Sequence, residues 1–407
     1  MRVLFVTHYF PPEVGAPQTR LLDLALALHA RGHEVTVLTG MPNYPDGVIP
    51  AAYRGRPLRR ERLHGIHVVR APIFPAPNRG VVRRLLNHLS FALSALPASA
   101  GAGPADVVLV ESPPLFAALS GLAVARLKRA PALLHIADLW PDAAIQFGVL
   151  RHRPVIAAAR ALERSAYRHA DALVAPTPGV ERVLREREGR KADVVLVPHG
   201  VDVERFPLDG HEPAAPHRVV YCGTIGLGHA TGTLIEAARI LADREADGYE
   251  VLIAGDGAEA PELRERVERS GPPNVTFLGR LPRRELPALL ASAGVAVATQ
   301  RDLPLLADAL STKVLEYMAA ARPVVVAASG WTAEVVHRAG AGIVCPPEDP
   351  DALAAAIVAV AADPERAGAM GRSGRSYVEA NLTRTSAVDR LEQTLTALAA
   401  GEATTTG

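Results

Sequence analysis

The sequence predicts an α/β protein made of two doubly wound domains, and three observations support this prediction. Short β-branched runs alternate with Ala-, Leu- and Arg-rich helical stretches from end to end, as in chains built of βα units around parallel sheets. The length of 407 residues exceeds what one hydrophobic core normally supports. A turn-rich stretch over 198–216 interrupts the alternation near the middle of the chain.

In the first half, short apolar runs are candidate strands and the stretches between them are candidate helices. The strands are expected at 3–7, 34–38, 66–70, 107–111, 132–137, 172–175 and 194–197. The clearest helices are expected at 19–30, 81–96, 114–128 and 155–168. Residues 1–197 should therefore form an N-terminal Rossmann-like domain, followed by a linker over 198–216.

After the linker the alternation resumes, with strands expected at 218–222, 250–254, 274–278, 294–298, 323–327 and 342–345. Two helices without a strand between them, at about 364–380 and 385–399, end the pattern. We expect a C-terminal Rossmann-like domain over 217–380, a helix over 381–400 that crosses back, and a disordered tail over 401–407. Ligands of such sheets bind outside the carboxyl ends of the strands, so a site is expected where the two domains face each other across a cleft.

The net charge of +1 conceals opposite balances in the two halves. Residues 1–200 carry ten more basic than acidic residues, and residues 201–407 carry nine more acidic than basic ones. Such a split indicates either that one half meets an anionic partner or that two domains have differently solvated surfaces.

Cysteine content and hydrophobic runs indicate the cellular compartment in which the protein is expected. Cys222 and Cys345 lie far apart and match no metal-ligand or redox spacing, and Cys222 ends an apolar run, which predicts a buried, unreactive thiol. The first apolar run is short and predicts a strand rather than a signal peptide. No run of about 18 apolar residues occurs. A reduced, cytoplasmic setting is therefore expected.

Two glycine-containing loops are candidate phosphate sites. In the loop after the first strand, Gly15 permits close backbone approach just before a helix whose N-terminus favours anions. The run Gly223-Thr224-Ile225-Gly226-Leu227-Gly228 follows the first strand of the second half. Neither loop is a GxGxxG fingerprint, which argues against a dinucleotide-dependent dehydrogenase.

The segment 306–323 carries the most specific signal. Asp308 and Glu316 lie eight residues apart, one in a loop and one in the helix that follows, and Ser311 or Thr312 is expected to cap that helix. A carboxylate one turn into the helix can accept hydrogen bonds from a ribose diol. Lys313, one of only three lysines, adds a cation beside the expected phosphates.

This segment resembles the paired-acid motif of retaining glycosyltransferases of family 4, which have the GT-B fold. Other motifs follow in the family's order, namely Pro198-His199-Gly200-Val201-Asp202, Gly255-Asp256-Gly257 and Phe277-Leu278-Gly279-Arg280. The motifs Pro11-Pro12-Glu13, 42–47 and Asp138-Leu139-Trp140-Pro141-Asp142 resemble a subgroup that includes fucosamine-type N-acetylhexosamine transferases of O-antigen and capsule synthesis.

The resemblance implies a role for each matching position. Catalytic roles fall on Asp308, which would contact the donor sugar, on Lys313, and on Asp138, which would orient the acceptor or the reacting sugar. Donor-binding roles fall on Gly15, Gly223, Thr224, Gly255, Asp256, Arg280, Leu310, Ser311, Thr312 and Glu316. Acceptor-side roles fall on Tyr9, Glu13, His135 and Trp140, with His8 as a further polar candidate.

The chain departs from the family pattern at two points. Asp308 stands where most members have Glu, and Thr224 and Ile225 stand where many members have Arg and Lys. We hypothesise that Lys313 supplies part of the missing charge.

The implied activity is retaining, metal-independent and cofactor-free transfer of a hexose or N-acetylhexosamine from a nucleotide-diphosphate sugar, expected to be UDP-linked. The acceptor would be a hydroxyl of a lipid-linked glycan in surface polysaccharide synthesis. Alternatives are a small secondary metabolite as acceptor, an epimerase or phosphorylase of the same fold, and a non-catalytic nucleotide-sugar-binding protein. No nucleic-acid partner is expected.

Arginines concentrate near the apolar helix expected within 79–96, a pattern that suits docking on anionic lipid headgroups. The alternative is a core helix with solvated arginines. On the membrane interpretation the protein would be peripheral on the inner face of the plasma membrane. The arginines are Arg54, Arg56, Arg59, Arg60, Arg62, Arg79, Arg83 and Arg84.

Overall fold

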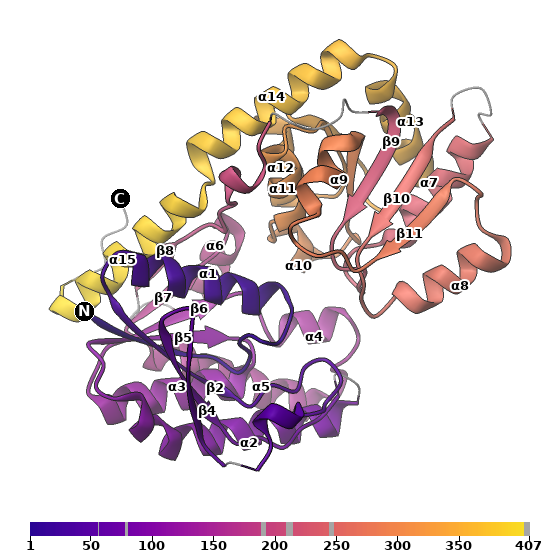
Figure 1. Cartoon of the computed structure of the whole chain (residues 1–407). Helices are drawn as coiled ribbons and strands as arrows, with labels where there is room; N and C mark the ends of the chain where they lie inside the picture. Colours follow the sequence, from indigo (N-terminus) through magenta and orange to yellow (C-terminus); the bar gives the residue numbers. More distant parts are fainter. Residues whose placement is uncertain (56, 78–79, 189–192, 209–214, 244–247, 403–407) are drawn as a thin grey trace. The chain divides into compact units, whose positions relative to one another are not determined.

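The computed structural model describes residues 1–55, 57–77, 80–188, 193–208, 215–243 and 248–402. The chain divides into two compact units, the first Met1–Val197 with Val388–Gly407 and the second Pro198–Ala387. Each unit contains one largely or wholly parallel sheet covered by helices (Figure 1). The predicted class, two doubly wound α/β units, is confirmed. Arg56, Arg79 and the tail residues 403–407 lie outside the described residues.

The sheet of the first unit has eight strands in the order β3-β4-β2-β1-β5-β6-β7-β8. The strands are parallel except β3, which pairs antiparallel with β4. The strand order changes direction between β1 and β5, so ligands of this sheet are expected at the carboxyl ends of these two strands. The strands are β1 (Arg2–Val6), β2 (Glu34–Gly40), β3 (Arg59–Leu63), β4 (Ile66–Ala71), β5 (Val107–Ser112), β6 (Ala132–Ile136), β7 (Ala172–Ala175) and β8 (Asp193–Leu196).

Helices connect successive parallel strands and cover both faces of this sheet, as in a doubly wound unit. α2 packs against α3 and α3 against α5 on one face of the sheet, and α1 lies on the opposite face (Figure 1). The helices are α1 (Ala16–Ala30), α2 (Val81–Ala98), α3 (Leu115–Lys128), α4 (Asp142–Gln146), α5 (Arg153–His169) and α6 (Pro178–Glu188).

The edge strand β3 was not predicted. Its sequence, RRERL, has no apolar alternation, so local pattern predicts only a basic cluster there. In the structure, Glu61 forms ion pairs with Arg59 (3.1 Å) and with the buried Arg70 on β4 (2.6 Å). Part of the basic cluster is therefore neutralised within the sheet.

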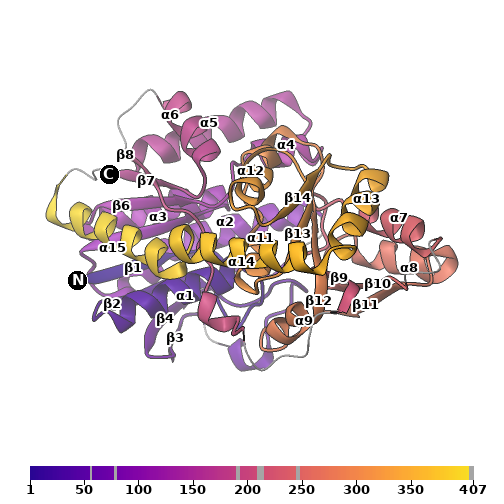
Figure 2. The same cartoon turned by 90° about the horizontal axis from the view of Figure 1, so that it is seen from above.

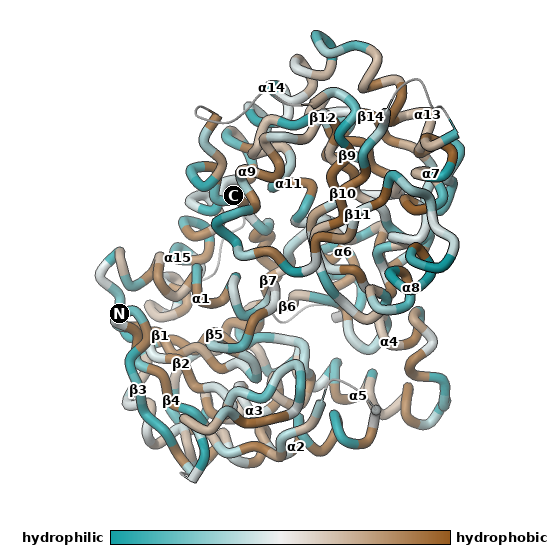
Figure 3. The backbone as a smooth tube through the Cα atoms, turned by 45° about the vertical axis from the view of Figure 1, so that its right-hand side comes forward, coloured by the Kyte–Doolittle hydropathy of each residue, from teal (hydrophilic) through white to brown (hydrophobic). Residues whose placement is uncertain are grey.

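The sheet of the second unit has six parallel strands in the order β11-β10-β9-β12-β13-β14. The hydrophobic strands β9 and β10 appear brown in Figure 3. The strands are β9 (Ala215–Cys222), β10 (Glu250–Ala254), β11 (Val275–Gly279), β12 (Ala293–Thr299), β13 (Val324–Ala327) and β14 (Gly342–Cys345). The sequence predicts β10 and β14 of this sheet, and β7 of the first sheet, with their observed bounds.

Side chains of this sheet alternate between two buried layers, as expected for a sheet covered on both faces. Val219 and Tyr221 join the layer formed with α7, α8 and α13, whereas Val220 and Cys222 join the layer with α9, α11, α12 and α14. Figure 2 shows the same helices from a second direction. They are α7 (Thr231–Ala242), α8 (Ala260–Ser270), α9 (Leu286–Ser292), α10 (Pro304–Ala307), α11 (Thr312–Ala319), α12 (Gly330–Arg338), α13 (Pro350–Ala361) and α14 (Pro364–Asn381).

The last helix, α15 (Arg384–Ala400), begins in the second unit, and its residues from Val388 onward belong to the first. Within the first unit it is fastened by Arg31, which forms ion pairs with Asp389 and Glu392, both at 2.5 Å. His33 adds a contact of 2.6 Å to Glu392. The expectation that the chain ends in two successive helices is confirmed.

Candidate functional site

Two glycine-containing loops lie side by side at the carboxyl edge of the second sheet. Gly223 (φ 146°) and Gly255 (φ 149°) have backbone conformations that other residues rarely adopt. A Cβ on Gly255 would lie 1.8 Å from the carbonyl oxygen of Gly223, so the loops pack backbone against backbone. Hydrogen bonds from Gly223 N to Ala254 O (2.9 Å) and from Ile225 N to Asp256 O (3.0 Å) join them.

α11 brings Lys313 to this edge. Lys313 is only 7% exposed, and its Nζ donates a hydrogen bond of 2.7 Å to the hydroxyl of Tyr221. The same Nζ lies 4.5 Å from the centroid of the Tyr221 ring. A Cβ on Gly223 would lie 2.8 Å from Lys313 Cε and 3.6 Å from Nζ, so the ammonium group lies beside the Gly223 loop. Within the described part of the chain, no carboxylate forms an ion pair with this Nζ.

An ammonium group that is buried with only a hydroxyl partner is costly to desolvate, and a bound anion would offset that cost. Tyr221 is satisfied without the lysine because its hydroxyl donates to the Thr224 carbonyl at 2.7 Å. The pair therefore holds a positive charge next to the Gly223 loop. Lys313 itself was predicted from the sequence, whereas Tyr221 was not.

Tyr317 fixes α11 against β9. Its fully buried hydroxyl accepts the backbone N–H of Cys222 at 2.8 Å and donates to the Cys222 carbonyl at 3.1 Å. Burial raises the pKa of the Cys222 thiol to about 12, so this cysteine is protonated and unreactive. The prediction that Cys222 is buried is confirmed.

Glu316 lies one turn further along α11 and is half-buried. Burial raises the pKa of its carboxyl group, while the positive charges of Arg283, Arg205 and Arg384 act in the opposite direction. These three arginines come from separate segments of the second unit and were not identified from the sequence. The result is a carboxylate set among cations rather than on a solvated helix face.

The rest of the paired-acid segment has a less regular structure than predicted. Ser311 occupies the N-cap position of α11, but its side chain makes no capping hydrogen bond, so that part of the prediction is wrong. Its backbone N–H instead donates to Thr332 Oγ1 at 3.0 Å. Leu310 is buried, Thr312 is exposed, and Asp308 is half-buried at the end of α10.

The remaining predicted donor-side residues of this unit are exposed. Thr224 is exposed at the Gly223 loop. Asp256 accepts the backbone N–H of Gly257 at 2.9 Å, and its carboxylate lies 3.7 Å from a guanidinium nitrogen of Arg280. The structure thus brings Gly223, Thr224, Gly255 and Asp256 together through the two joined loops, with Arg280 beside Asp256.

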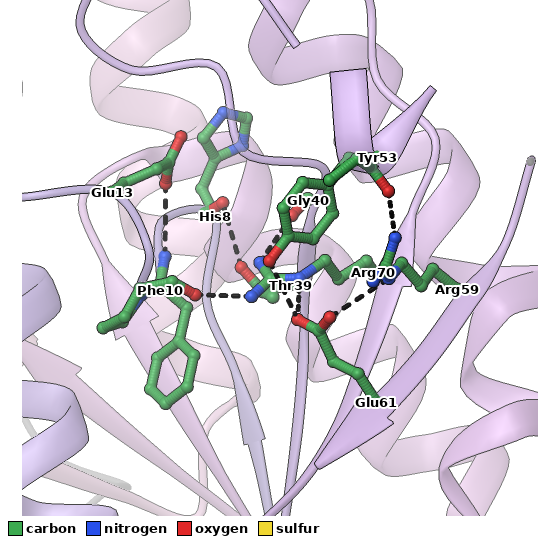
Figure 4. Close-up of polar contacts among 11 residues, drawn as sticks. His8, Phe10, Glu13, Thr39, Gly40, Tyr53, Arg59, Glu61 and Arg70 are labelled. Atoms are coloured by element: carbon green, nitrogen blue, oxygen red, sulfur yellow. Dashed lines mark hydrogen bonds and ion pairs between the residues drawn. The ribbon is translucent and has the colours of Figure 1, made fainter. Parts of the chain in front are cut away.

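In the first unit, Glu13 connects the loop after β1 to the loop after β2. Its buried carboxylate accepts the backbone N–H of Phe10 at 3.3 Å (Figure 4). It also accepts the backbone N–H groups of Asn43 and Tyr44, both at 2.8 Å. Burial raises the pKa of Glu13, against the effect of these three amides. Glu13, predicted on the acceptor side, therefore uses its oxygens to hold loops together.

A group of rings surrounds Tyr9, also predicted on the acceptor side. The half-buried Tyr9 packs edge to face against Tyr44, with ring centroids 5.5 Å apart, and its hydroxyl lies 3.3 Å from His88 Nε2. Behind it, His8 Nε2 pairs with Asn87 Oδ1 at 2.7 Å. Burial lowers the pKa of His8 to about 3 and that of His88 to about 4, so both rings are neutral at pH 7.

A third group lies at the carboxyl ends of β5 and β6. The Glu111 carboxylate forms an ion pair with Arg20 of α1 and lies 2.9 Å from His135 Nδ1. Asp138 follows two residues after β6. The Asp138 side chain is exposed. Desolvation by the surrounding chain raises its pKa to about 6, with Arg20 lowering it and Glu111 raising it.

The other predicted residues of this unit lie nearby in the chain. Gly15 is the N-cap residue of α1 with an extended backbone, and a Cβ there would lie 2.4 Å from Gln18 Oε1. Trp140 is half-buried in the turn before α4. Asp142, the first residue of α4, forms ion pairs with Arg187 and with Arg160 (3.4 Å), which hold this turn in place.

The described ranges hold neither a cluster of metal ligands nor a helix that could span a membrane. No three His, Cys, Asp or Glu side chains there converge in a way that could hold a metal ion. No helix among those same residues combines the length and the apolar composition needed to cross a bilayer.

Sequence reasoning did not identify Arg20, Glu111 or Tyr221. Glu111 had one detectable signal, since it is the first charged residue after an apolar run that predicts a buried strand. Tyr221 had none, because an aromatic residue in a buried strand is ordinary core.

Comparisons with known proteins cover most of the chain. Residues 15–200 match the family described as "Glycosyl transferase 4-like domain", and residues 216–363 match "Glycosyl transferases group 1". A glycogen synthase of Mycobacterium tuberculosis is 27% identical over 395 residues, which cover 92% of this chain and 89% of that protein. The putative colanic acid biosynthesis glycosyl transferase WcaI of Escherichia coli is 26% identical, with 88% of this chain and 91% of that protein covered.

A solved structure shares the fold. HepE from Anabaena, in complex with UDP-glucose, aligns with a TM-score of 0.71 at 17% identity and covers 98% of this chain and 100% of its own. The fold and the two family matches define a GT-B glycosyltransferase. Within that class, the chain belongs to the glycosyltransferases of family 4.

Proposed function

We propose that this protein is a retaining, metal-independent transferase that moves a hexose or N-acetylhexosamine from a UDP-linked donor to a lipid-linked glycan. The acceptor would be an intermediate of surface polysaccharide synthesis, as in the fucosamine-type subgroup. The protein would act in the cytoplasm, at the inner face of the plasma membrane, without a cofactor. Two relatives support the finer terms, since WcaI is named for colanic acid biosynthesis and HepE was solved with UDP-glucose.

The observation that carries the proposal is the buried Lys313 ammonium group beside the Gly223 loop. Among the residues that the structure describes, its one hydrogen-bond partner is the Tyr221 hydroxyl, so a bound diphosphate would supply the missing negative charge. Many members of the family place this positive charge on Arg and Lys residues that directly follow the first strand of the second unit. In this chain the cation reaches the same loop from α11.

With the diphosphate placed beside Lys313, the other parts of the donor can be assigned to residues of the second unit. Glu316, about one turn after Lys313 on α11, would accept hydrogen bonds from the ribose hydroxyls. Asp308 would contact the transferred sugar, and Arg280 would lie beside the base. Amides of Gly223, Thr224, Leu310 and Thr312 would face the diphosphate and the sugar hydroxyls. Gly15, in the first unit, stays a predicted donor-binding position.

Catalysis would then depend on positioning and on stabilising the charge of the leaving group. The bond from the anomeric carbon to the phosphate oxygen breaks as the acceptor oxygen bonds to the same face of that carbon. The departing diphosphate takes the acceptor's proton, and Lys313 neutralises its developing charge. Asp138 would orient the acceptor hydroxyl, with Tyr9, His135 and Trp140 nearby in the first unit.

The acceptor class is supported by the surface of α2. Val82, Leu85, Leu86 and Leu93 expose large apolar surfaces on this helix, and Leu93 is 72% exposed. Arg83 and Arg84 are exposed beside them. Apolar side chains next to basic ones suit the headgroup region of an anionic bilayer, where a lipid-linked acceptor is found.

A thermal-shift panel of UDP-, GDP- and TDP-sugars tests the donor class. A donor at about 100 times its dissociation constant adds about 2.7 kcal/mol to the stability of the unit that binds it. For a unit of this size, that corresponds to a rise in Tm of about 5 to 11 °C. UDP-sugars should give this rise and GDP- and TDP-sugars a smaller one.

Product analysis then tests the reaction. Incubation of the selected donor with a polyprenyl-diphosphate-linked sugar should give a glycosylated lipid that retains the anomeric configuration of the donor, with or without EDTA. A preference for GDP-sugars would refute the UDP assignment. Inversion of configuration, or loss of activity in EDTA, would refute the retaining, metal-independent mechanism.

A further inference from the structure

Three aromatic rings lie together at the carboxyl edge of the first sheet. Tyr9 belongs to the loop after β1, Tyr44 to the loop after β2 and His88 to α2. β1 and β2 are parallel neighbours, so these two loops leave the sheet at the same edge. All three residues are half-buried, so each keeps part of its surface in contact with solvent. We refer to Tyr9, Tyr44 and His88 as the ring cluster.

The members of the ring cluster contact one another through ring edges and one hydrogen bond. Tyr9 packs edge to face against Tyr44, with centroids 5.5 Å apart, and against His88, with centroids 6.4 Å apart. The Tyr9 hydroxyl and His88 Nε2 form a hydrogen bond of 3.3 Å. Burial lowers the pKa of His88 to about 4 and raises the pKa of Tyr9, so both groups are uncharged near pH 7. The cluster therefore combines ring surface with neutral polar groups.

A buried polar network joins the three segments that carry the ring cluster. His8 Nε2 pairs with Asn87 Oδ1 at 2.7 Å, and Asn87 Nδ2 donates to Asn43 Oδ1 at 3.2 Å. Such a network restricts the motion of the segments that it connects. Each ring therefore has a fixed position before any ligand binds, which favours recognition. Every member of the ring cluster directly follows a network residue in the chain: Tyr9 follows His8, Tyr44 follows Asn43 and His88 follows Asn87.

The neighbouring residues of α2 indicate what kind of molecule the ring cluster meets. Arg84 is exposed one helical turn before His88, and its charge acts on both Tyr9 and His88. Leu85 and Leu86, the next two residues, expose large apolar side chains. Ring surface, a cation and apolar side chains thus lie next to one another. A lipid-linked sugar has the complementary parts in sequence, namely a sugar ring, an anionic diphosphate and a hydrocarbon chain.

We propose that the ring cluster binds the sugar ring of the lipid-linked acceptor. A pyranose has C–H groups on its faces and hydroxyls around its rim, so it suits aromatic surface with uncharged polar groups. The C–H groups pack against Tyr9 and Tyr44, and a sugar hydroxyl forms hydrogen bonds with the Tyr9–His88 pair. This inference rests on the proposed function, which supplies the acceptor class. It adds Tyr44 and His88 to the acceptor-side residues and gives the cluster a specificity, for a lipid diphosphate that carries a sugar.

Two probes test this specificity, decyl diphosphate that carries N-acetylglucosamine and decyl diphosphate alone. Both have the same charge-bearing group and chain, so the ratio of their Kd values reports the contribution of the sugar. Isothermal titration calorimetry measures this ratio in the full-length wild type and in variants. A cluster that only held the loops together would contribute to stability and leave the ratio unchanged.

The wild type should bind the sugar-bearing probe about tenfold more tightly than decyl diphosphate. Tyr9→Phe removes one hydroxyl and Tyr44→Leu removes one ring, and each should reduce this ratio by about threefold or more. Tyr53→Leu is the matched control in the same unit, because the half-buried Tyr53 lies against the guanidinium groups of Arg59 and Arg70 and outside the ring cluster. It should keep the wild-type ratio.

Two results would overturn the inference. Equal binding of both probes by the wild type would show that no sugar subsite exists, and a ratio that persists in both Tyr9→Phe and Tyr44→Leu would show that the sugar binds elsewhere. If Tyr44→Leu does not fold, proton spectra of the probe bound to the wild type decide instead. Sugar C–H protons packed on aromatic rings shift upfield, and unshifted protons would refute the contact.

UDP binding separates failure of this inference from failure of the proposed function. The ring cluster lies in the first unit and the proposed UDP site in the second, so Tyr9→Phe and Tyr44→Leu should bind UDP within about twofold of the wild type. Wild-type protein that binds no nucleotide refutes the proposed function, and the two probes still decide whether the ring cluster binds a sugar.

Discussion

Replacing Lys313 with methionine removes one positive charge and keeps most of the side-chain volume. The ammonium group is buried beside the Gly223 loop, so a diphosphate there would form at least one hydrogen bond to a charged donor. Such bonds contribute about 1.5 to 3 kcal/mol. At about 1.4 kcal/mol for each tenfold change, the Kd for UDP should rise about 10- to 150-fold.

The stability of the nucleotide-free protein should stay the same or increase, although nucleotide binding becomes weaker. Lys313 Nζ has the Tyr221 hydroxyl but no carboxylate as a partner within the ranges described, so its burial costs free energy. Methionine removes that cost, and Tyr221 still donates to the Thr224 carbonyl. We therefore expect the Tm of the nucleotide-free variant to equal or exceed that of the wild type.

Isothermal titration calorimetry with UDP measures the first effect and thermal unfolding without nucleotide measures the second. Lys128→Met, on α3 of the first unit, is the matched control and should change the Kd less than twofold. The reasoning about Lys313 fails if Lys313→Met binds UDP within threefold of the wild type. It also fails if weaker binding comes with a clear drop in Tm, because lost packing would then explain both results.

Three further predictions concern other parts of the molecule. Each basic residue near an anionic membrane contributes about 1 kcal/mol to binding, so the double variant Arg83→Gln/Arg84→Gln should bind phosphatidylserine vesicles about 30-fold more weakly in flotation assays. The control double variant Arg164→Gln/Arg168→Gln should bind like the wild type. If the wild type itself does not bind at low salt, the membrane interpretation is refuted. Burial raises the pKa of Glu163 to about 7, so its stabilising effect is present below its unfolded pKa and is lost as pH rises through about 7. The Tm of Glu163→Gln should therefore rise relative to that of the wild type between about pH 5 and about pH 8, and a constant difference would contradict this linkage. Burial raises the thiol pKa values of Cys222 and Cys345 to about 12 and about 11, so a thiol reagent near neutral pH should label neither until the protein unfolds, and rapid native labelling would show that one is accessible.

Much of the fold followed from local patterns. Short continuous apolar runs are typical of strands in a sheet covered on both faces, and β10 was predicted with its observed bounds. The edge strand β3 was missed because it is stabilised by ion pairs of Glu61 with Arg59 and Arg70 rather than by an apolar face. Pattern reasoning detects hydrophobic periodicity and has no access to such pairings.

The candidate site divides in the same way. Lys313 and Glu316 were predicted because they share a motif with Asp308, and motifs are continuous in sequence. The structure gives Glu13 a different role from the acceptor-side one expected from the sequence, since its carboxylate accepts hydrogen bonds from the backbone amides of Asn43, Tyr44 and Phe10. No sequence pattern indicates which backbone groups a loop carboxylate will meet.

The sequence alone determined the fold class, the family resemblance and the charged residue types at the carboxyl edges of the strands. Local spacing encodes these features, because strand period, helix period and loop motifs depend on neighbours along the chain. Only the tertiary structure decided that Lys313 rests on Tyr221 beside Gly223, and that Glu111 holds Arg20 and His135 together. These contacts join segments up to about a hundred residues apart, and their energies come from burial and distance, which exist only once the sheets have formed.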